Sequence, residues 1–188
     1  MKISVVIPVY NQEKLISHAI DSVLMQKKCD FECIVIDGGS TDGTVQKLKK
    51  YNKKIKWISE KDSGISNAVN KGLKMSTGDV VTFIGSDDCY SSILSLFKIK
   101  NFFIKNKKAR CVNASYTIVN SEGVKIQSFV ISYKNFLRGL PFQKWILGIT
   151  NFIIQPSMFW KRELMNEIGY FKEDLNKIEF AEQAINYA

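Results

Sequence analysis

Two adjacent carboxylates, Asp87 and Asp88, follow an apolar run at residues 80–84 that has the composition of a buried strand. Open α/β sheets bind ligands at the carboxyl ends of their strands, which is where these acids would emerge. Neighbouring carboxylates repel each other unless a cation or hydrogen-bond donors compensate them. Because magnesium and manganese take oxygen ligands and share them with phosphates, the pair predicts a site for Mn²⁺ or Mg²⁺ on a diphosphate. The alternative is a solvated turn in which Ser86 or Asp87 caps the next helix.

The chain alternates between strand-like apolar runs and longer runs with helical spacing. The spacing predicts strands over residues 3–9, 31–36, 54–58 and 80–84, a helix over 11–26, and a second helix capped by Ser63 and stopped near Gly78. A further pair of strands, 111–119 and 124–131, would form a hairpin. Strands and helices in this order predict an α/β fold with right-handed crossovers and a mixed, mainly parallel sheet flanked by helices.

Acidic residues recur where the predicted parallel strands end. Asp37 follows the second strand, Asp62 lies shortly after the third, and Asp87 with Asp88 follows the fourth. Acids with purely structural roles have no reason to gather at one sheet edge. Their convergence therefore predicts a ligand site there.

Length and composition indicate one folded domain. The chain has 188 residues, of which 45% are hydrophobic and 24% charged, close to the globular average. The net charge of +9 comes largely from lysine runs at residues 47–56 and 98–110. Such runs suit nucleic acid, anionic lipid or an anionic substrate, and are also typical of a solvated helix face. Phe102 and Phe103 fit a helix core stripe better than base stacking, so we expect no nucleic-acid partner.

Several other classes of site are disfavoured. No G-x-G-x-x-G or P-loop motif occurs, and the four cysteines form no CxxC pair, which favours reduced thiols in a cytosolic protein. His18 falls opposite the apolar stripe of its helix, so we expect it to be solvated. The longest late apolar run, residues 145–154, is about half of a membrane span.

The motifs resemble the family-two glycosyltransferases with the GT-A fold, which move a sugar from a nucleotide donor. The matching segments are Val6–Asn11, Asp37–Thr44, Ser59–Gly64, Asn67–Gly72, Gly78–Asp79 and Ser86–Asp88, followed later by Gln155–Glu163 and Gly169–Phe171. The resemblance implies a donor half over residues 1–90 and an acceptor half over 91–188 of a single domain.

The resemblance also implies a nucleotide pocket. Pro8, Tyr10 and Asn11 would line it, with the Tyr10 ring packing on a base. Asp37 would accept a hydrogen bond from the base, typically uracil, and Asp62 would lie near the same nucleoside. The alternative for Asp37 is to organise the turn that follows it.

The remaining implied roles concern the diphosphate and the sugar. Asn67 and Lys71 share a helix face, where Lys71 would meet a phosphate, although a plain polar helix surface is equally consistent with them. Asp88 would ligate the metal ion and Asp87 would contact the donor ribose or sugar. The metal would stabilise the charge on the departing diphosphate.

The family pattern fails at the catalytic base. Inverting members use a carboxylate to take the acceptor's proton, and Phe180 stands where that acid is expected. Glu179 or Glu182 would have to substitute, although both are also consistent with solvated helix residues. The sequence ends at Ala188, so we expect an acceptor half that is truncated.

These observations predict an inverting, metal-dependent enzyme. It would transfer a sugar from a nucleotide-diphosphate donor, for which we expect a UDP-sugar, to a glycan or lipid-linked acceptor in cell-surface polysaccharide synthesis. We expect a cytoplasmic protein that can rest on the inner face of an anionic membrane. The alternative is a truncated, catalytically impaired relative that binds nucleotide sugar. A sugar nucleotidyltransferase is disfavoured because its Gly-rich, Arg-bearing loop is absent.

Overall fold

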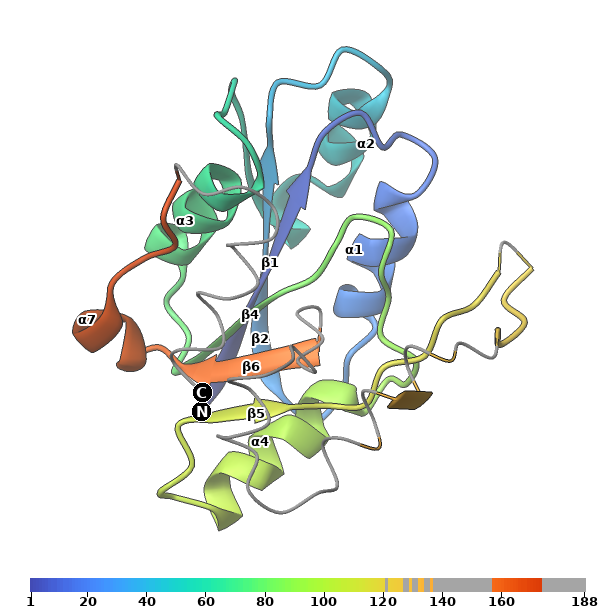
Figure 1. The fold of residues 1–188 in the computed structure, drawn as a ribbon. Coiled ribbons are helices and arrows are strands. Elements are labelled where there is room, and N and C mark those ends of the chain that lie inside the picture. Colours follow the sequence, from blue (N-terminus) through green and yellow to red (C-terminus); the bar gives the residue numbers. More distant parts are fainter. Residues whose placement is uncertain (121, 127–128, 130–131, 134–135, 137–156, 174–188) are drawn as a thin grey trace.

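The computed structural model describes residues 1–120, 122–126, 129, 132–133, 136 and 157–173 (Figure 1). Its strands are β1 Lys2–Val9, β2 Asp30–Asp37, β3 Lys56–Ser59, β4 Val80–Phe83, β5 Cys111–Asn113 and β6 Met158–Lys161. Its helices are α1 Ile16–Leu24, α2 Thr44–Tyr51, α3 Ile65–Met75, α4 Ser95–Lys105 and α7 Leu164–Ile168, with a short 3-10 helix at Asn52–Lys54.

The six strands form one mixed sheet in the order β3-β2-β1-β4-β6-β5. The first four are mutually parallel, whereas β6 pairs antiparallel with β4 and with β5. This confirms the predicted α/β class and the mainly parallel sheet. Because β1 lies between β2 and β4, the loops that follow these three strands meet at one edge.

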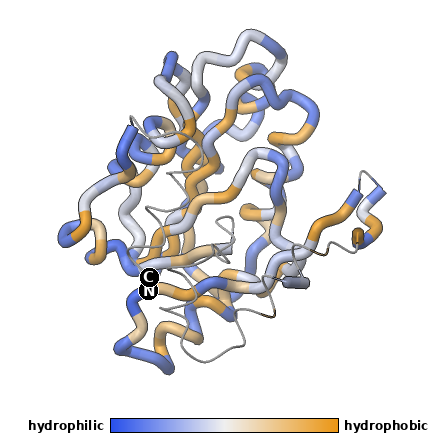
Figure 2. The backbone as a smooth tube through the Cα atoms, viewed as in Figure 1, coloured by the Kyte–Doolittle hydropathy of each residue, from blue (hydrophilic) through white to orange (hydrophobic). Residues whose placement is uncertain are grey.

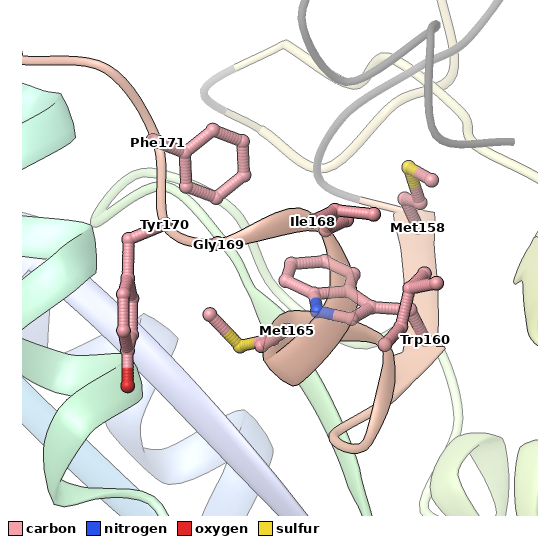
Figure 3. A pocket seen from close by; sticks show the side chains of 8 residues that line it. Met158, Trp160, Met165, Ile168, Gly169, Tyr170 and Phe171 are labelled. Carbon is pink, nitrogen blue, oxygen red and sulfur yellow. The ribbon is translucent and has the colours of Figure 1, made fainter.

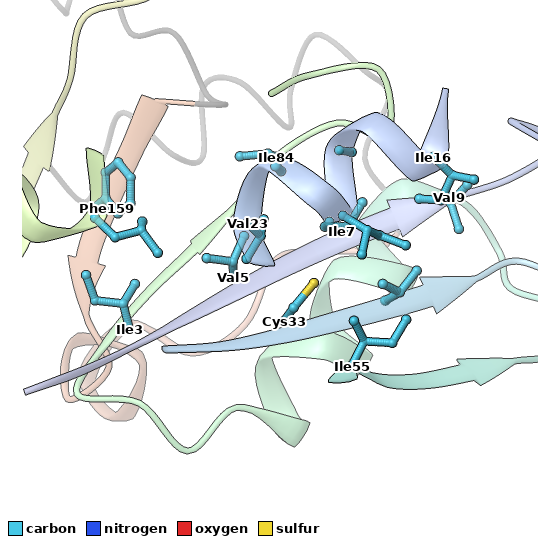
Figure 4. Close-up of a cluster of buried hydrophobic side chains, with 14 of the residues drawn as sticks. Ile3, Val5, Ile7, Val9, Ile16, Val23, Cys33, Ile55, Ile84 and Phe159 are labelled. Carbon is cyan, nitrogen blue, oxygen red and sulfur yellow. The ribbon is translucent and has the colours of Figure 1, made fainter. Parts of the chain in front are cut away.

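Helices cover both faces of the sheet, so the central strands are apolar on both sides. Alternate residues of β1, from Ile3 to Val9, pack against α1, α2 and α4, as Figure 4 shows for α1. The opposite face, which includes Val6 and Ile34, packs against α3 and α7. Figure 1 shows α3 and α7 across the sheet from α1 and α2, and Figure 2 shows the hydrophobic segments running between these layers.

The elements differ from the predicted ones mainly at their ends. The first helix begins at Ile16 instead of residue 11, since Asn11 has a left-handed φ of 50° that no helix admits. Ser63 does not cap α3, whose N-cap is Gly64 without a side-chain hydrogen bond. Where the structure describes the predicted hairpin strands 111–119 and 124–131, it has the short strand β5 and a bridge between Val119 and Lys125.

The predicted surfaces of two helices agree with the structure. His18 is exposed on α1. Leu96, Ile99 and Phe103 form the buried stripe of α4, and Phe102 packs partly buried beside it. The aromatic residues of the second lysine run therefore belong to the core.

A buried carboxylate ties the strands together at the amino edge of the sheet. Glu32 accepts hydrogen bonds from Ser4 Oγ, Lys56 Nζ and both the backbone and the hydroxyl of Thr77, and Lys2 Nζ lies 3.2 Å from it. Burial alone would raise the pKa of Glu32, but these hydrogen bonds outweigh it and hold that pKa far below its usual range. The acid is thus a structural one, opposite the predicted ligand edge.

Candidate active site

The two adjacent acids lie in the turn that follows β4, and both point over Gly85. A Cβ atom at position 85 would lie 2.6 Å from Asp87 Oδ1 and 2.8 Å from Asp88 Oδ2, so only glycine allows the carboxylates to converge there. Asp87 is exposed and Asp88 is half-buried. The next helix, α4, begins seven residues after Asp88 with Leu94 as N-cap and no side-chain cap. The capping alternative for this acid pair is therefore wrong.

Tyr116, which sequence reasoning did not select, completes this turn. Its hydroxyl donates to Asp88 Oδ1 at 3.0 Å, while the Gly85 backbone N–H donates to Asp88 Oδ2 at 2.9 Å. Burial raises the pKa of Asp88, and the charge of Asp87 adds to that shift against the two hydrogen bonds. Burial and the Asp88 charge raise the pKa of Tyr116 to about 12, so its hydroxyl stays protonated and donates.

The acid turn suits a hard cation. Its donors are carboxylate oxygens, and each oxygen of Asp88 accepts one hydrogen bond, which leaves a second lone pair for a metal ion. Across the described ranges, no three His, Cys, Asp or Glu side chains surround a common point. Two convergent carboxylates nevertheless fit Mg²⁺ or Mn²⁺, because these ions complete their shells with phosphate oxygens and water.

Asp37, at the end of β2, serves the turn that follows it. Its side chain is fully buried, and Oδ2 accepts from the backbone N–H groups of Gly39 and Ser40 at 3.2 and 3.0 Å and from Ser59 Oγ at 2.6 Å. Oδ1 accepts from Ser40 Oγ. The geometry therefore favours the turn-organising alternative, because a base would find no exposed Asp37 oxygen.

Asp62 is a second acid beside this turn, and unlike Asp37 it is partly exposed. Its carboxylate lies over Gly38, where a Cβ atom would come within 2.6 Å of Asp62 Oδ2. Oδ1 accepts from the Gly64 backbone N–H at 2.9 Å, and the residue is half-buried. The glycine after Asp37 thus makes room for a carboxylate supplied from the loop after β3.

The loop after β1 forms the neighbouring wall. Asn11 N–H donates to Ser40 Oγ, and Asn11 Oδ1 accepts from Thr41 N–H, both at 2.8 Å. Pro8 is buried and Tyr10 is 60% exposed at this edge. Asn11 therefore joins the two loops, and the exposed Tyr10 ring is available to a flat ligand.

Two other predicted nucleotide contacts are engaged within the protein. Lys71 Nζ lies 2.7 Å from Glu60 Oε1 in a salt bridge, and Asn67 Nδ2 donates to Glu173 Oε2 at 2.7 Å. Glu179 and Glu182, the predicted base candidates, lie outside the described residues, as does Phe180. Within the described part of the acceptor half, Glu163, Glu167 and Glu173 are all paired with cations or amides.

A comparison with protein-family models matches residues 4–169 to "Glycosyl transferase family 2". The chain belongs to this family. The match spans both the acid-bearing edge of the sheet and the antiparallel strands β5 and β6.

Relatives of this family 2 chain include a glycosyltransferase whose name gives its substrate. The chain is 31% identical to an "uncharacterized glycosyltransferase" of Rickettsia felis over 93% of its length, and 30% identical to the poly(ribitol-phosphate) beta-N-acetylglucosaminyltransferase TarS of Staphylococcus aureus over 95%. The chain spans only 27% and 31% of these two proteins.

Solved structures agree with the GT-A fold of the family 2 chain. A crystal structure of TarS superimposes with a TM-score of 0.73 at 29% identity, covering all of this chain and 55% of that one. TarS has also been solved in complex with UDP-GlcNAc, with a TM-score of 0.72 at 27% identity, covering all of this chain and 54% of that one. None of the helices in the described residues combines the length and apolar character that a membrane span needs.

Proposed function

We propose that this chain is an inverting glycosyltransferase that uses a UDP-sugar donor in the synthesis of a cell-surface glycan. The observation that carries the proposal is the placement of Asp62 over Gly38, after β2, and of Asp87 with Asp88 over Gly85, after β4, on the two sides of the carboxyl end of β1. TarS, which is similar over nearly the whole chain, supports both UDP-GlcNAc as the first donor to test and poly(ribitol phosphate) as the first acceptor.

Each acid has a part in this proposal. Asp62 accepts a hydrogen bond from the imide N–H of uracil, while Tyr10 packs on the ring. Asp88 holds Mn²⁺ or Mg²⁺, and Asp87 contacts the donor ribose or sugar. When bound, the metal ion supplies Lewis-acid stabilisation of the diphosphate. Asp37 and Asn11 keep the two loops in place without touching the donor's reacting atoms.

Transfer then follows from the arrangement of the two halves. The acceptor hydroxyl oxygen attacks the anomeric carbon of the sugar, and the bond between that carbon and the diphosphate oxygen breaks. The diphosphate leaves with the bonding electrons, and the hydroxyl proton passes to a carboxylate of the acceptor half, which we assign to Glu179 or Glu182. A single displacement of this kind inverts the anomeric carbon.

The second candidate function is nucleotide-sugar binding without turnover. Glu163, Glu167 and Glu173 are engaged with other protein groups, and Phe180 stands where the family resemblance places the base. A chain that binds UDP-GlcNAc but releases no UDP from it in the presence of acceptor would have this function.

Calorimetric titration separates these outcomes. UDP, GDP, CDP and dTDP are titrated with and without Mn²⁺ into the wild-type chain and the Asp88→Ala variant. Binding of UDP alone, only with metal and only by the wild type, supports the donor site. Metal-independent binding, or equal binding by Asp88→Ala, would exclude the metal role of Asp88. UDP release from UDP-GlcNAc then decides between transfer and binding alone.

The proposal includes a membrane-facing surface on α4. No acid occurs between Asp88 and Glu122 in the sequence, whereas Lys98, Lys105 and Lys108 are exposed on or just after this helix. Ile104 is 48% exposed among them. Clustered lysines around an exposed apolar side chain suit an anionic bilayer, on which a lipid-linked acceptor would be presented.

A further inference from the structure

Asn70 is a buried side chain whose three hydrogen bonds all go to a segment about one hundred residues away. Only 2% of it is exposed, on the sheet-facing side of α3. Its Nδ2 donates to the Phe171 carbonyl at 2.7 Å, and its Oδ1 accepts from the Phe171 backbone N–H at 3.0 Å. The side chain thus pairs with the backbone of Phe171 as a neighbouring strand would.

Glu173 extends this contact to the first turn of the same helix. Its Oε1 accepts the second Nδ2 hydrogen of Asn70 at 2.9 Å, and its Oε2 accepts from Asn67 Nδ2 at 2.7 Å. The hydrogen bonds from Asn70 and Asn67 lower the pKa of Glu173, with smaller contributions from Lys74 and Lys71. Both oxygens of Glu173 are thus bonded to amides of α3, which ties this carboxylate to the helix.

Ring contacts fix the rest of the segment. The Phe171 ring packs edge-on against Phe83 of β4 and Trp160 of β6, with centroids 6.0 and 6.3 Å apart. Lys74 Nζ lies 5.2 Å from the centroid of the Tyr170 ring. Figure 3 shows Phe171 and Trp160 among the side chains that line a small apolar hollow. Residues 170–173 are therefore held by ring contacts as well as by the hydrogen bonds from Asn67 and Asn70.

The contacts between α3 and Glu173 matter for the reaction because α3 also adjoins the loop that carries Asp62. The helix begins directly after the loop of Asp62 and Gly64, and its first turn carries Asn67. Glu173 lies six residues before Glu179 and nine before Glu182. The cluster of Asn67, Asn70 and Glu173 therefore joins the helix behind the donor loop to the start of the segment that carries both base candidates.

We propose that Glu173 is a positioning residue for sugar transfer, held by Asn67 and Asn70. This inference rests on the proposed function. The contacts of Asn67 and Asn70 hold Glu173 against α3, six residues before Glu179 in the sequence, and we expect this fixed point to limit where an acceptor-side carboxylate can lie relative to the donor. Donor binding does not depend on them, because Asp62, Asp88 and Tyr10 lie on other segments. The Asn67 of the family motif thus serves the acceptor half instead of the nucleotide.

The test separates turnover from donor affinity. In Glu173→Ala, we expect kcat for UDP release from UDP-GlcNAc with poly(ribitol phosphate) to fall at least tenfold, with the Kd for UDP and Mn²⁺ within twofold of wild type. Glu173→Gln should restore most of kcat, because Asn67 can turn its amide and accept from the new amide. Glu167→Ala is the matched control, because Glu167 is an exposed acid six residues before Glu173 that pairs with Arg110. This variant should leave kcat and Kd unchanged.

A reciprocal exchange tests the contact itself. Asn67→Asp sets two carboxylates against each other and should lower kcat as Glu173→Ala does. Adding Glu173→Gln to Asn67→Asp restores one donor and one acceptor, so kcat should recover. Equal losses of kcat and donor affinity in Glu173→Ala, or no recovery in the double variant, would overturn the positioning role.

If the chain binds UDP but has no turnover, the proposed transfer is wrong and kcat cannot be measured. A second measurement then tests the contact of Glu173 with α3. Amide hydrogen exchange of the peptide spanning residues 174–188 is compared between wild type, Glu173→Ala and Glu167→Ala. Faster exchange in Glu173→Ala alone supports the anchor. Identical exchange in all three overturns it, whatever the outcome for transfer.

Discussion

Replacing Asp37 and Asp62 separately by alanine should give opposite phenotypes, although both acids lie at the ligand edge. Asp37 is fully buried and accepts four hydrogen bonds, whereas Asp62 is half-buried and accepts one, from Gly64. We therefore expect Asp37→Ala to lower stability with little effect on UDP, and Asp62→Ala to lower UDP affinity with little effect on stability.

The magnitudes follow from these contacts. A hydrogen bond contributes a net ~1 kcal/mol, and the groups released from Asp37 are partly within reach of water, so the loss in Asp37→Ala is about 3–4 kcal/mol. For a domain of this length, each ~1 kcal/mol moves Tm by ~2–4 °C, which predicts a fall of roughly 10 °C. Asp62→Ala should stay within ~0.5 kcal/mol of wild type. Loss of a charged acceptor for the uracil imide should weaken UDP binding by about 10- to 150-fold.

One assay reports both effects. Thermal unfolding is followed with and without saturating UDP and Mn²⁺, because a ligand that binds only the folded state raises Tm. Wild type and Asp37→Ala should show similar rises from different starting values, and Asp62→Ala should show a much smaller rise. Asp30→Ala, at the opposite end of β2, is the control. If Asp37→Ala keeps the wild-type Tm and fails to bind UDP, the base contact is Asp37 and the burial argument is wrong.

Three other regions give predictions of their own. Glu32→Gln should lower Tm by roughly 5 °C at pH 7 in a thermal unfolding series. Because the folded pKa of Glu32 is depressed, its stabilisation is full above the unfolded pKa of ~4.3 and is lost as pH falls through the folded value. The difference in Tm between wild type and variant should therefore shrink in acid, and a constant difference would contradict the role of the Glu32 hydrogen bonds. Tyr116→Phe should change the Kd for Mn²⁺–UDP several-fold in calorimetry while the metal-free chain keeps its Tm within ~2 °C, and an unchanged Kd would show that the hydroxyl does not orient Asp88. The double variant Lys105→Glu, Lys108→Glu should no longer sediment with vesicles that contain phosphatidylglycerol. If the wild-type chain also stays in solution with these vesicles, the proposed membrane-facing surface on α4 is wrong.

The edge of the sheet where the acids lie was predictable, but the different contacts of each acid were not. Alternating strands and helices fix a parallel sheet, and a parallel sheet fixes the edge at which Asp37, Asp62 and Asp88 emerge. The saturation of Asp37 depends on Ser59, 22 residues away on β3, which no local pattern indicates. Gly38 carried the available signal, because a glycine directly after a strand-end acid leaves room for a side chain from elsewhere.

Contacts across the two halves were beyond local reasoning for the same reason. Tyr116 reaches Asp88 from 28 residues later in the chain, and Asn67 reaches Glu173 across 106. A polar face with asparagines spaced three apart on α3 is consistent with solvent, with a phosphate or with a packed segment. Only the return of the chain along α3 decides between them.

The number of donors at each carboxylate oxygen distinguishes the roles of these acids. An ionised carboxylate oxygen has two lone pairs, and Asp37 Oδ2 already accepts from three donors with no exposed surface. Each oxygen of Asp88 accepts from one donor, and Asp62 Oδ2 lies over Gly38 at the half-exposed loop. A ligand can add to Asp62 and Asp88 without displacing a protein contact, whereas at Asp37 it must break the turn. We therefore expect ligands at this edge to bind Asp62 and Asp88, while Asp37 keeps its hydrogen bonds to Gly39, Ser40 and Ser59.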